Sequence, residues 1–333
     1  MISERLSEKL RTCSLLATLF VVYRHSFVIH TFYGTNTCDN HELMFFTHWI
    51  SNLTEVAVPI FFMISGFFFL GKNYYSDIKY GSMLQKKART LLIPFIFWNI
   101  IGLLVLFLCR SSDIPHDLFP FMKKFFSSDF NGPLWYVRDI MLYMLLVPLY
   151  QWIFYKRMNV FCVVFVVYLF ARWLPVDCAI LSSEGVLFFI LGGILGKYKI
   201  LDKQIGKKWV AWALFILWQA CCLFCDVWAN EWIHKIIVIL GVLSVWYGID
   251  LIPSKFCMKM KQISCYAFFV YVTHFYCVKI VKVIMAHWFY GNGTIALLTF
   301  LLVPVIVVAC LLKIGMLYKA YLPKVYLFTT GNR

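Results

Sequence analysis

The sequence predicts an all-α polytopic membrane protein of about ten transmembrane helices, with both the N-terminus and the C-terminus on the inner side of the bilayer. Three observations predict this fold. Of the 333 residues, 62% are hydrophobic and only 14% are charged, whereas about a quarter of the residues of a soluble domain are charged. Apolar runs of membrane-spanning length recur along the whole chain, and such runs form helices that satisfy their own backbone hydrogen bonds in lipid. The Lys and Arg residues gather on one side of the resulting topology.

Each expected span corresponds to one apolar run of the sequence. A bilayer core takes about 20 apolar residues of helix, and most of the runs approach that length. The loops between the runs are too short for a separate soluble domain, so we expect one integral-membrane domain over residues 1–333. The expected spans are 12–33, 45–70, 91–109, 134–155, 159–175, 184–197, 209–228, 234–252, 262–285 and 295–318.

The distribution of basic residues predicts the orientation. With the N-terminus inside, 22 of the 31 Lys and Arg residues fall in inside segments, 5 fall outside and 4 lie within spans. Cytoplasmic loops of membrane proteins carry such an excess. The net charge of +15 is therefore interpreted as membrane topology, and no nucleic-acid partner is expected. The 12 Cys residues lie mostly in apolar runs without the spacing of metal ligands, so we also expect no metal site.

A few ionisable side chains lie inside the expected spans. A charged side chain there raises the free energy of the protein in the bilayer, so such residues usually have a function. His25 and His274 fall at similar depths, roughly 20 Å and 18 Å from the cytoplasmic starts of their spans at about 1.5 Å per residue. Each histidine also has a simpler interpretation, as a hydrogen-bonding strut between helices. Arg24 points about 100° away from His25 around the helix axis, and we expect it to form an ion pair, more structural than catalytic, with Glu55.

The first span also carries a polar stripe. Its members fall within about 60° of one another around a helix of 3.6 residues per turn, so they predict one wall of a crevice reaching the middle of the bilayer. The stripe consists of Arg11, Ser14, Thr18 and His25.

Five short motifs in order along the chain resemble those of the membrane-bound acyltransferase 3 family. The first span ends in Arg24-His25-Ser26, and the second contains VPIFFMISG at 58–66. The sequence LLIPF at 91–95 follows a basic cluster, as in the family. The stretches GPLWYVRD at 132–139 and VYVTH at 270–274 complete the series.

The resemblance implies transfer of an acyl group, usually acetyl, from cytoplasmic acyl-CoA to a hydroxyl group of a surface polysaccharide or its lipid-linked precursor. It implies a histidine that takes the proton of the hydroxyl as it attacks, and His25 is our candidate for this general base. A covalent acyl-histidine is left open. The candidates for oxyanion donors are His274, Arg24 and Tyr271, and Glu55 joins the catalytic group as the partner of Arg24.

Basic residues at the inner ends of two spans are candidates for holding the CoA phosphates by charge-assisted hydrogen bonds. Inside-positive topology or contact with anionic lipid would equally place basic residues there. The expected acyl-CoA residues are Arg11, Lys86, Lys87 and Arg89. The family often has an Arg eleven positions before the histidine of the first span; Ser14 stands there, and Arg11 is the candidate substitute.

An acceptor sugar is expected to meet aromatic and polar side chains, with Trp135, Arg138 and Tyr271 as candidates. Arg138 lies near the outer mouth of its span, close to the membrane interface, and has a second interpretation, as an anchor of that span. The rival function is a transporter or flippase for a lipid-linked sugar, which would use buried charges as a conduction path. A third interpretation is a sensor or structural bundle. The resemblance favours the enzyme and a bacterial inner membrane, with the lipid bilayer and a glycan as partners.

Overall fold

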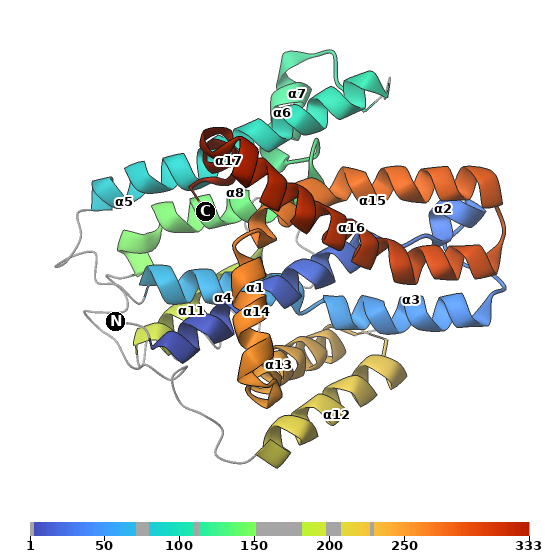
Figure 1. Cartoon of the computed structure of the whole chain (residues 1–333), viewed down its shortest axis with the longest axis horizontal. Coiled ribbons are helices and arrows are strands. Elements are labelled where there is room, and N and C mark those ends of the chain that lie inside the picture. The colour runs from blue at the N-terminus through green and yellow to red at the C-terminus, as the bar shows by residue number, and fades with distance from the viewer. Residues whose placement is uncertain are drawn as a thin grey trace. The chain divides into compact units, whose positions relative to one another are not determined.

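The computed structural model describes residues 3–70, 80–109, 113–150, 182–197, 208–226 and 230–332. Every regular element in these ranges is a helix (Figure 1). The described helical stretches that are long and apolar enough to cross a membrane number six, and a shorter apolar helix covers Lys208–Phe224. The six stretches are Glu4–Tyr33, His41–Leu70, Tyr80–Leu108, Glu231–Leu251, Ala267–Phe289 and Gly293–Tyr321.

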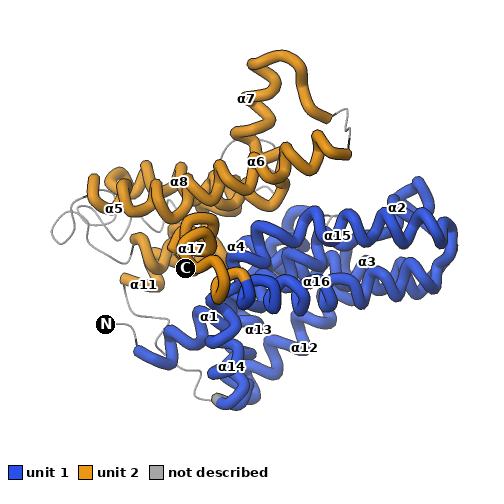
Figure 2. Tube along the Cα trace, turned by 45° about the horizontal axis from the view of Figure 1, so that its top comes forward, with its two compact units in different colours: residues 1–60, 204–317 blue, residues 61–203, 318–333 orange. Residues whose placement is uncertain are grey.

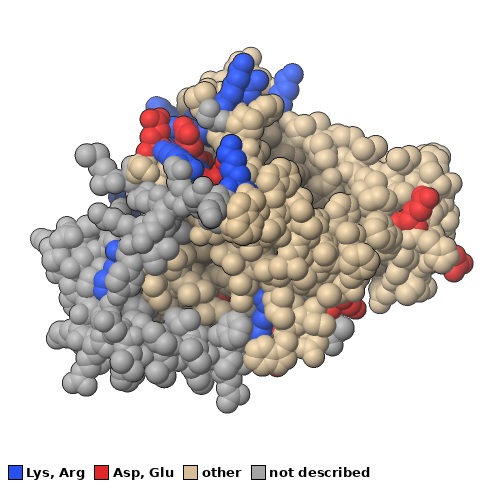
Figure 3. Space-filling view, turned by 90° about the horizontal axis from the view of Figure 1, so that it is seen from below, with Lys and Arg blue, Asp and Glu red and all other residues tan. Residues whose placement is uncertain are grey.

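These six stretches coincide with six of the expected spans and confirm an all-helical, membrane-spanning fold. The expected span 159–175 lies outside the described residues, as do residues 151–155 of the span 134–155 and residues 227–228 of the span 209–228. The total of about ten spans and the orientation stay predictions. Large areas of the surface in Figure 3 carry no charged side chain, as expected of a face covered by lipid.

The chain divides into two compact units, shown in different colours in Figure 2. Unit 1 comprises residues 1–60 and 204–317, and unit 2 comprises residues 61–203 and 318–333. Unit 1 contains α1 (Glu4–Arg24), α2 (Ile29–Tyr33), α3 (His41–Thr54), α12 (Lys208–Phe224), α13 (Glu231–Gly248), η4 (Ile249–Leu251), α14 (Ser254–Ser264), α15 (Ala267–Phe289) and most of α16 (Gly293–Tyr321).

Unit 2 holds most of α4 (Ala57–Leu70), the short π-helix η1 (Ala88–Leu92) and the 3₁₀ turn η2 (Gly132–Leu134). Its other helices are α5 (Tyr80–Lys87), α6 (Ile93–Leu108), α7 (Leu118–Ser127), α8 (Trp135–Leu145), α11 (Ser183–Lys197) and α17 (Pro323–Thr330).

Helix α1 is the element around which unit 1 packs, with contacts to α3, α13, α14 and α15. Its first turns are held by charge. The Nζ of Lys9 lies 2.7 Å from Asp250 and 4.3 Å from the ring centroid of Trp246, and the guanidinium of Arg5 lies 3.0 Å from the same carboxylate. Because Lys9 is buried, its charge depends on this carboxylate.

A second group of charges joins α14 to the start of α1. The Nζ of Lys261 donates to Glu4 and to Glu8, at 3.2 Å in each case. These two hydrogen bonds raise the pKa of Lys261 above its ordinary value. The start of α1 is thus tied to two segments that follow it by more than 240 residues.

In unit 2, α4 and α11 pack at backbone distance. A methyl group at Gly66 would meet the carbonyl of Phe189, and one at Gly192 would meet the carbonyl of Met63. The hydroxyl of Ser65 lies 2.8 Å from that of Tyr136. The Ser-Gly pair of the second expected span is therefore a helix contact, of the kind that small residues make in membranes.

Several irregularities depart from the expected spans. Helix α1 ends at Arg24 inside its apolar stretch, and α2 begins at Ile29. The third stretch begins at Tyr80 rather than 91 and includes the π-helix η1. Helix α7 lies in a segment expected to be a loop, where Ser128 closes it with φ 70°. Helices α14 and α15 divide the start of the expected span 262–285.

Replacing Gly66 by Ala tests the contact between α4 and α11. We expect a loss of about 1–3 kcal/mol in the free energy of unfolding, because the new methyl group meets backbone atoms that cannot move alone. Gly81→Ala is the matched control, since nothing lies within 4 Å of the added Cβ. Thermal unfolding in detergent measures both, and equal melting temperatures would contradict the close approach.

Replacing Asp250 by Asn tests the charges at the start of α1. The change leaves the buried Lys9 ammonium without its carboxylate, so we expect a loss of about 3 kcal/mol in the free energy of unfolding. Asp117→Asn is the matched control, because Asp117 is exposed and its side chain does not cap α7. If the two variants have the same melting temperature, the Lys9 ammonium does not depend on the Asp250 carboxylate.

Candidate active site

The two histidines that the sequence places at similar depth lie in contact within unit 1. His25 is the C-cap residue of α1, and His274 lies in the first half of α15. Their ring centroids are 5.3 Å apart, and the Phe275 ring lies perpendicular to that of His25 at a centroid distance of 5.2 Å. His274 is 0% exposed. Two imidazoles distant in sequence thus share one apolar environment.

The hydrogen bonds of His274 define its tautomer. Its Nδ1 lies 2.8 Å from the carbonyl oxygen of Tyr271 and 3.2 Å from that of Val270. Because carbonyl oxygens only accept, Nδ1 carries the proton. Nε2 is buried and has no hydrogen-bond partner among the described residues. Neutral His274 therefore presents an unused lone pair at Nε2.

The strut interpretation of these histidines requires hydrogen bonds between helices. The ring of His25 makes none within the part of the chain that the structure describes, and its neighbours are aromatic rings. His274 bonds only to the backbone of its own helix. Neither imidazole therefore bonds a second helix among the described residues.

The ion pair expected between Arg24 and Glu55 is confirmed. The guanidinium lies 2.7 Å from the Glu55 carboxylate, and it donates a hydrogen bond of 3.0 Å to the hydroxyl of Ser51. The pair joins the last residue of α1 to the C-cap of α3. Arg24 is engaged by α3, so it fixes the direction in which α1 ends.

Lys282 is one of the four basic residues that lie within expected spans, and the sequence predicts no role for it. Its Nζ donates to the carbonyl oxygens of His25, at 2.8 Å, and Phe27, at 3.0 Å. The available signal was a lysine placed eight residues after His274 in the same apolar helix.

The candidate residues for the CoA phosphates belong to both units. Arg11 is exposed on α1 in unit 1. In unit 2, Lys86 at the end of α5 and Arg89 in η1 are exposed, whereas the Nζ of Lys87 lies 4.3 Å from the ring centroid of Phe69. Lys87 therefore also packs on α4. Ser14, at the position of the family's Arg, donates to the carbonyl of Leu10.

Arg138, a candidate for substrate binding, is engaged within unit 2. Its guanidinium lies 2.7 Å from the fully buried carboxylate of Asp139 and 3.2 Å from the carbonyl of Ser127. Asp139 also accepts from the backbone N–H of Ser182, at 3.1 Å. These contacts favour the interpretation of Arg138 as an anchor.

The other two candidates for substrate binding lie in separate units. Trp135 is half-buried at the start of α8, with its ring centroid 6.1 Å from that of Phe62. Tyr271 is buried on α15, with its ring centroid 6.2 Å from that of His274. Among the described residues, no group of three or more His, Cys, Asp or Glu side chains could hold a metal ion.

The chain is similar to known proteins over most of its length. Residues 15–314 match the family model of acyltransferase 3, which is described as an acyltransferase domain. The chain is also 23% identical over 308 residues to the succinoglycan biosynthesis protein ExoH of Rhizobium meliloti (strain 1021). That match covers 85% of this chain and 80% of the relative. No solved structure matches the chain significantly.

A double-mutant cycle measures the strength of the ion pair between Arg24 and Glu55. The two side chains are 34% and 12% exposed, so solvent screens part of their attraction. We expect a coupling of about 1 kcal/mol between Arg24→Gln and Glu55→Gln in the free energy of unfolding. A coupling of zero would contradict a stabilising role of this ion pair between α1 and α3.

Proposed function

The chain belongs to the acyltransferase 3 family, and from this premise we propose that it transfers an acetyl group from cytoplasmic acyl-CoA to a hydroxyl group of a polysaccharide or its lipid-linked precursor. The family match spans 300 residues, so the activity of an O-acyltransferase applies to nearly the whole chain. The name of the relative in succinoglycan biosynthesis supports a glycan acceptor. A cytoplasmic donor and a glycan acceptor favour the bacterial inner membrane as the location.

The observation that carries the proposal is the pair of imidazoles within the membrane-spanning part of unit 1. An alcohol is a poor nucleophile at neutral pH, and a histidine is the usual base that removes its proton. His25 lies beside His274. Among the described residues, the ring nitrogens of these two histidines form no hydrogen bond with another helix. His25, which is half-buried, is therefore the proposed base for an acceptor hydroxyl, with the buried Nε2 of His274 beside it.

The reaction is written with His25 as the base. The hydroxyl oxygen attacks the carbonyl carbon of the thioester while its proton passes to His25, and a C–O bond forms. The tetrahedral intermediate then collapses, the C–S bond breaks, and the proton on His25 passes to the departing CoA sulfur. The products are an O-acyl ester and free CoA, and His25 returns to its neutral form.

His274 is proposed to accept a hydrogen bond through Nε2, either from the acceptor hydroxyl or from His25. The neutral tautomer has no proton at Nε2, so His274 stabilises an oxyanion only after it takes up a proton. Arg24 already contacts Glu55 and Ser51. Tyr271, beside His274, thus remains the candidate neutral oxyanion donor.

The CoA phosphates are proposed to bind Lys86 and Arg89 of unit 2, which are exposed, with help from Lys87 of the same unit. Arg11, exposed in unit 1, is a separate candidate. Aromatic faces suit the apolar face of a sugar ring, so the proposed sugar contacts are Tyr271 in unit 1 and, separately, Trp135 in unit 2. Arg138 supports this region through Asp139 rather than through the substrate.

Transfer of label from acetyl-CoA tests the proposal. The purified protein in lipid nanodiscs is given radiolabelled acetyl-CoA and glycans whose esters have been removed by alkali, beginning with deacylated succinoglycan. We expect ester-linked label and free CoA thiol in equal amounts. We expect His25→Ala to lower kcat by about 10²–10⁴-fold, the usual contribution of a general base.

His30→Ala is the matched control, because His30 is exposed on α2, five residues after His25. It should transfer at the rate of the wild type. Activity with another acyl donor but not with acetyl-CoA would correct the donor, and equal rates for the two histidine variants would remove His25 as the base. Movement of a lipid-linked sugar without CoA release would point to a flippase.

A further inference from the structure

Helix α1 ends within its apolar stretch, and this end creates a local need for hydrogen-bond donors. The amide of His25 donates to Val21, that of Ser26 donates to Tyr23, and the Ser26 hydroxyl donates to Val22. No backbone N–H of the described chain donates to the carbonyl oxygens of His25 and Phe27. In an apolar layer, carbonyl groups without donors are strongly unfavourable.

The ammonium of Lys282 supplies the donors that the helix end lacks. Its Nζ reaches the His25 oxygen at 2.8 Å and the Phe27 oxygen at 3.0 Å. Both are charge-assisted hydrogen bonds, and the positive charge lies at the negative end of the α1 dipole. The position of Lys282 is therefore coupled to the place where α1 stops.

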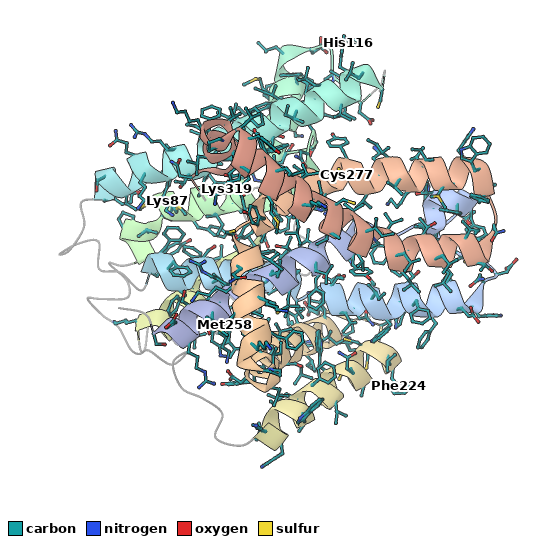
Figure 4. All side chains as sticks on the ribbon, in the orientation of Figure 1. Lys87, His116, Phe224, Met258, Cys277 and Lys319 are labelled. Carbon is teal, nitrogen blue, oxygen red and sulfur yellow. The ribbon has the colours of Figure 1, made fainter. Side chains whose placement is uncertain are left out.

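Helix α15 contacts His25 from two levels. His274 and Phe275 contact its ring. Lys282 contacts its carbonyl oxygen and lies about 10.5 Å beyond Phe275 along the same helix, at about 1.5 Å per residue. Side chains lean toward the N-terminus of their helix, which lets Lys282 reach back to this level. Figure 4 labels Cys277, which lies on α15 between the two contacts.

Lys279 lies on the same helix but, unlike Lys282, does not bond the carbonyls at the end of α1. Lys279 is exposed and makes no hydrogen bond or ion pair among the described residues. Such a side chain extends along the helix toward the polar surface of the membrane. The two lysines share one helix and similar sequence surroundings, so the carbonyl contacts distinguish Lys282.

We propose that Lys282 is a positioning residue for His25: by bonding the His25 and Phe27 carbonyls, it fixes the end of α1 so that the His25 ring faces His274. The proposal rests on the proposed function for its catalytic consequence. Its structural part, the immobilisation of residues 25–28, stands apart from any activity.

Replacement of Lys282 by Met tests the proposal, with Lys279→Met as the matched control. The Met side chain keeps most of the volume of lysine and removes the charge and the donors. A misplaced catalytic group lowers the rate of the chemical step, so we expect kcat with acetyl-CoA and deacylated succinoglycan to fall by about 10-fold to 100-fold. The KM for acetyl-CoA should stay within about twofold, because substrate binding is retained. Lys282→Arg keeps donors and charge and should recover much of kcat.

Hydrogen–deuterium exchange of the same proteins in nanodiscs gives a readout that needs no catalysis. Lys282→Met should raise the exchange of peptides covering residues 25–33, and Lys279→Met should leave it unchanged. If the wild type transfers nothing, the proposed function fails while this measurement still decides the structural part.

Three results would overturn the proposal. The first is wild-type kcat and wild-type exchange for Lys282→Met. The second is an equal loss of kcat for the Met variants of Lys282 and Lys279. The third is failure of both Lys282→Met and Lys282→Gln to fold, which would make Lys282 a requirement of the fold rather than a positioning residue.

Discussion

A helix that ends inside an apolar layer must have donors for its last carbonyl groups, and unit 1 depends on this requirement. At the end of α1, Lys282 bonds two carbonyl oxygens. At the end of α12, the amide of Asn52 bonds the carbonyls of Cys222 and Cys225, at 2.8 Å each. Polar side chains within the spans are thus partners of helix ends, and the position of His25 follows from where such an end falls.

Hydropathy was enough to predict the helical class and six of the spans, because burial in lipid selects long apolar helices. It could not predict the irregularities. An average over some twenty residues does not resolve the end of α1 at Arg24 or the π-helix at Ala88–Leu92. Helix α7 was not predicted, because its segment is too short and contains too many polar residues to be recognised as a membrane span.

The candidate site was partly accessible from the sequence. Counting residues from the span starts placed His25 and His274 at one level, and the charges of Arg24 and Glu55 suggested their pairing. The engagement of Arg138 with its neighbour Asp139 was missed, although the two are adjacent, because their side-chain directions depend on α8. The contacts of Lys282 depend on the path of another helix's backbone, which no local pattern encodes.

The two ends of α1 are held by charges in different surroundings. At the first turns, Lys261 meets Glu4 and Glu8 at a place where Glu4 is 83% exposed. Mobile ions screen exposed pairs over about 10 Å at 0.1 M salt, and they do not enter the apolar layer around Lys282. Ionic strength therefore acts most strongly on the exposed pairs at the first turns of α1. Added salt weakens the exposed Lys261 pairs first, whereas the hydrogen bonds from Lys282 to the His25 and Phe27 carbonyls persist.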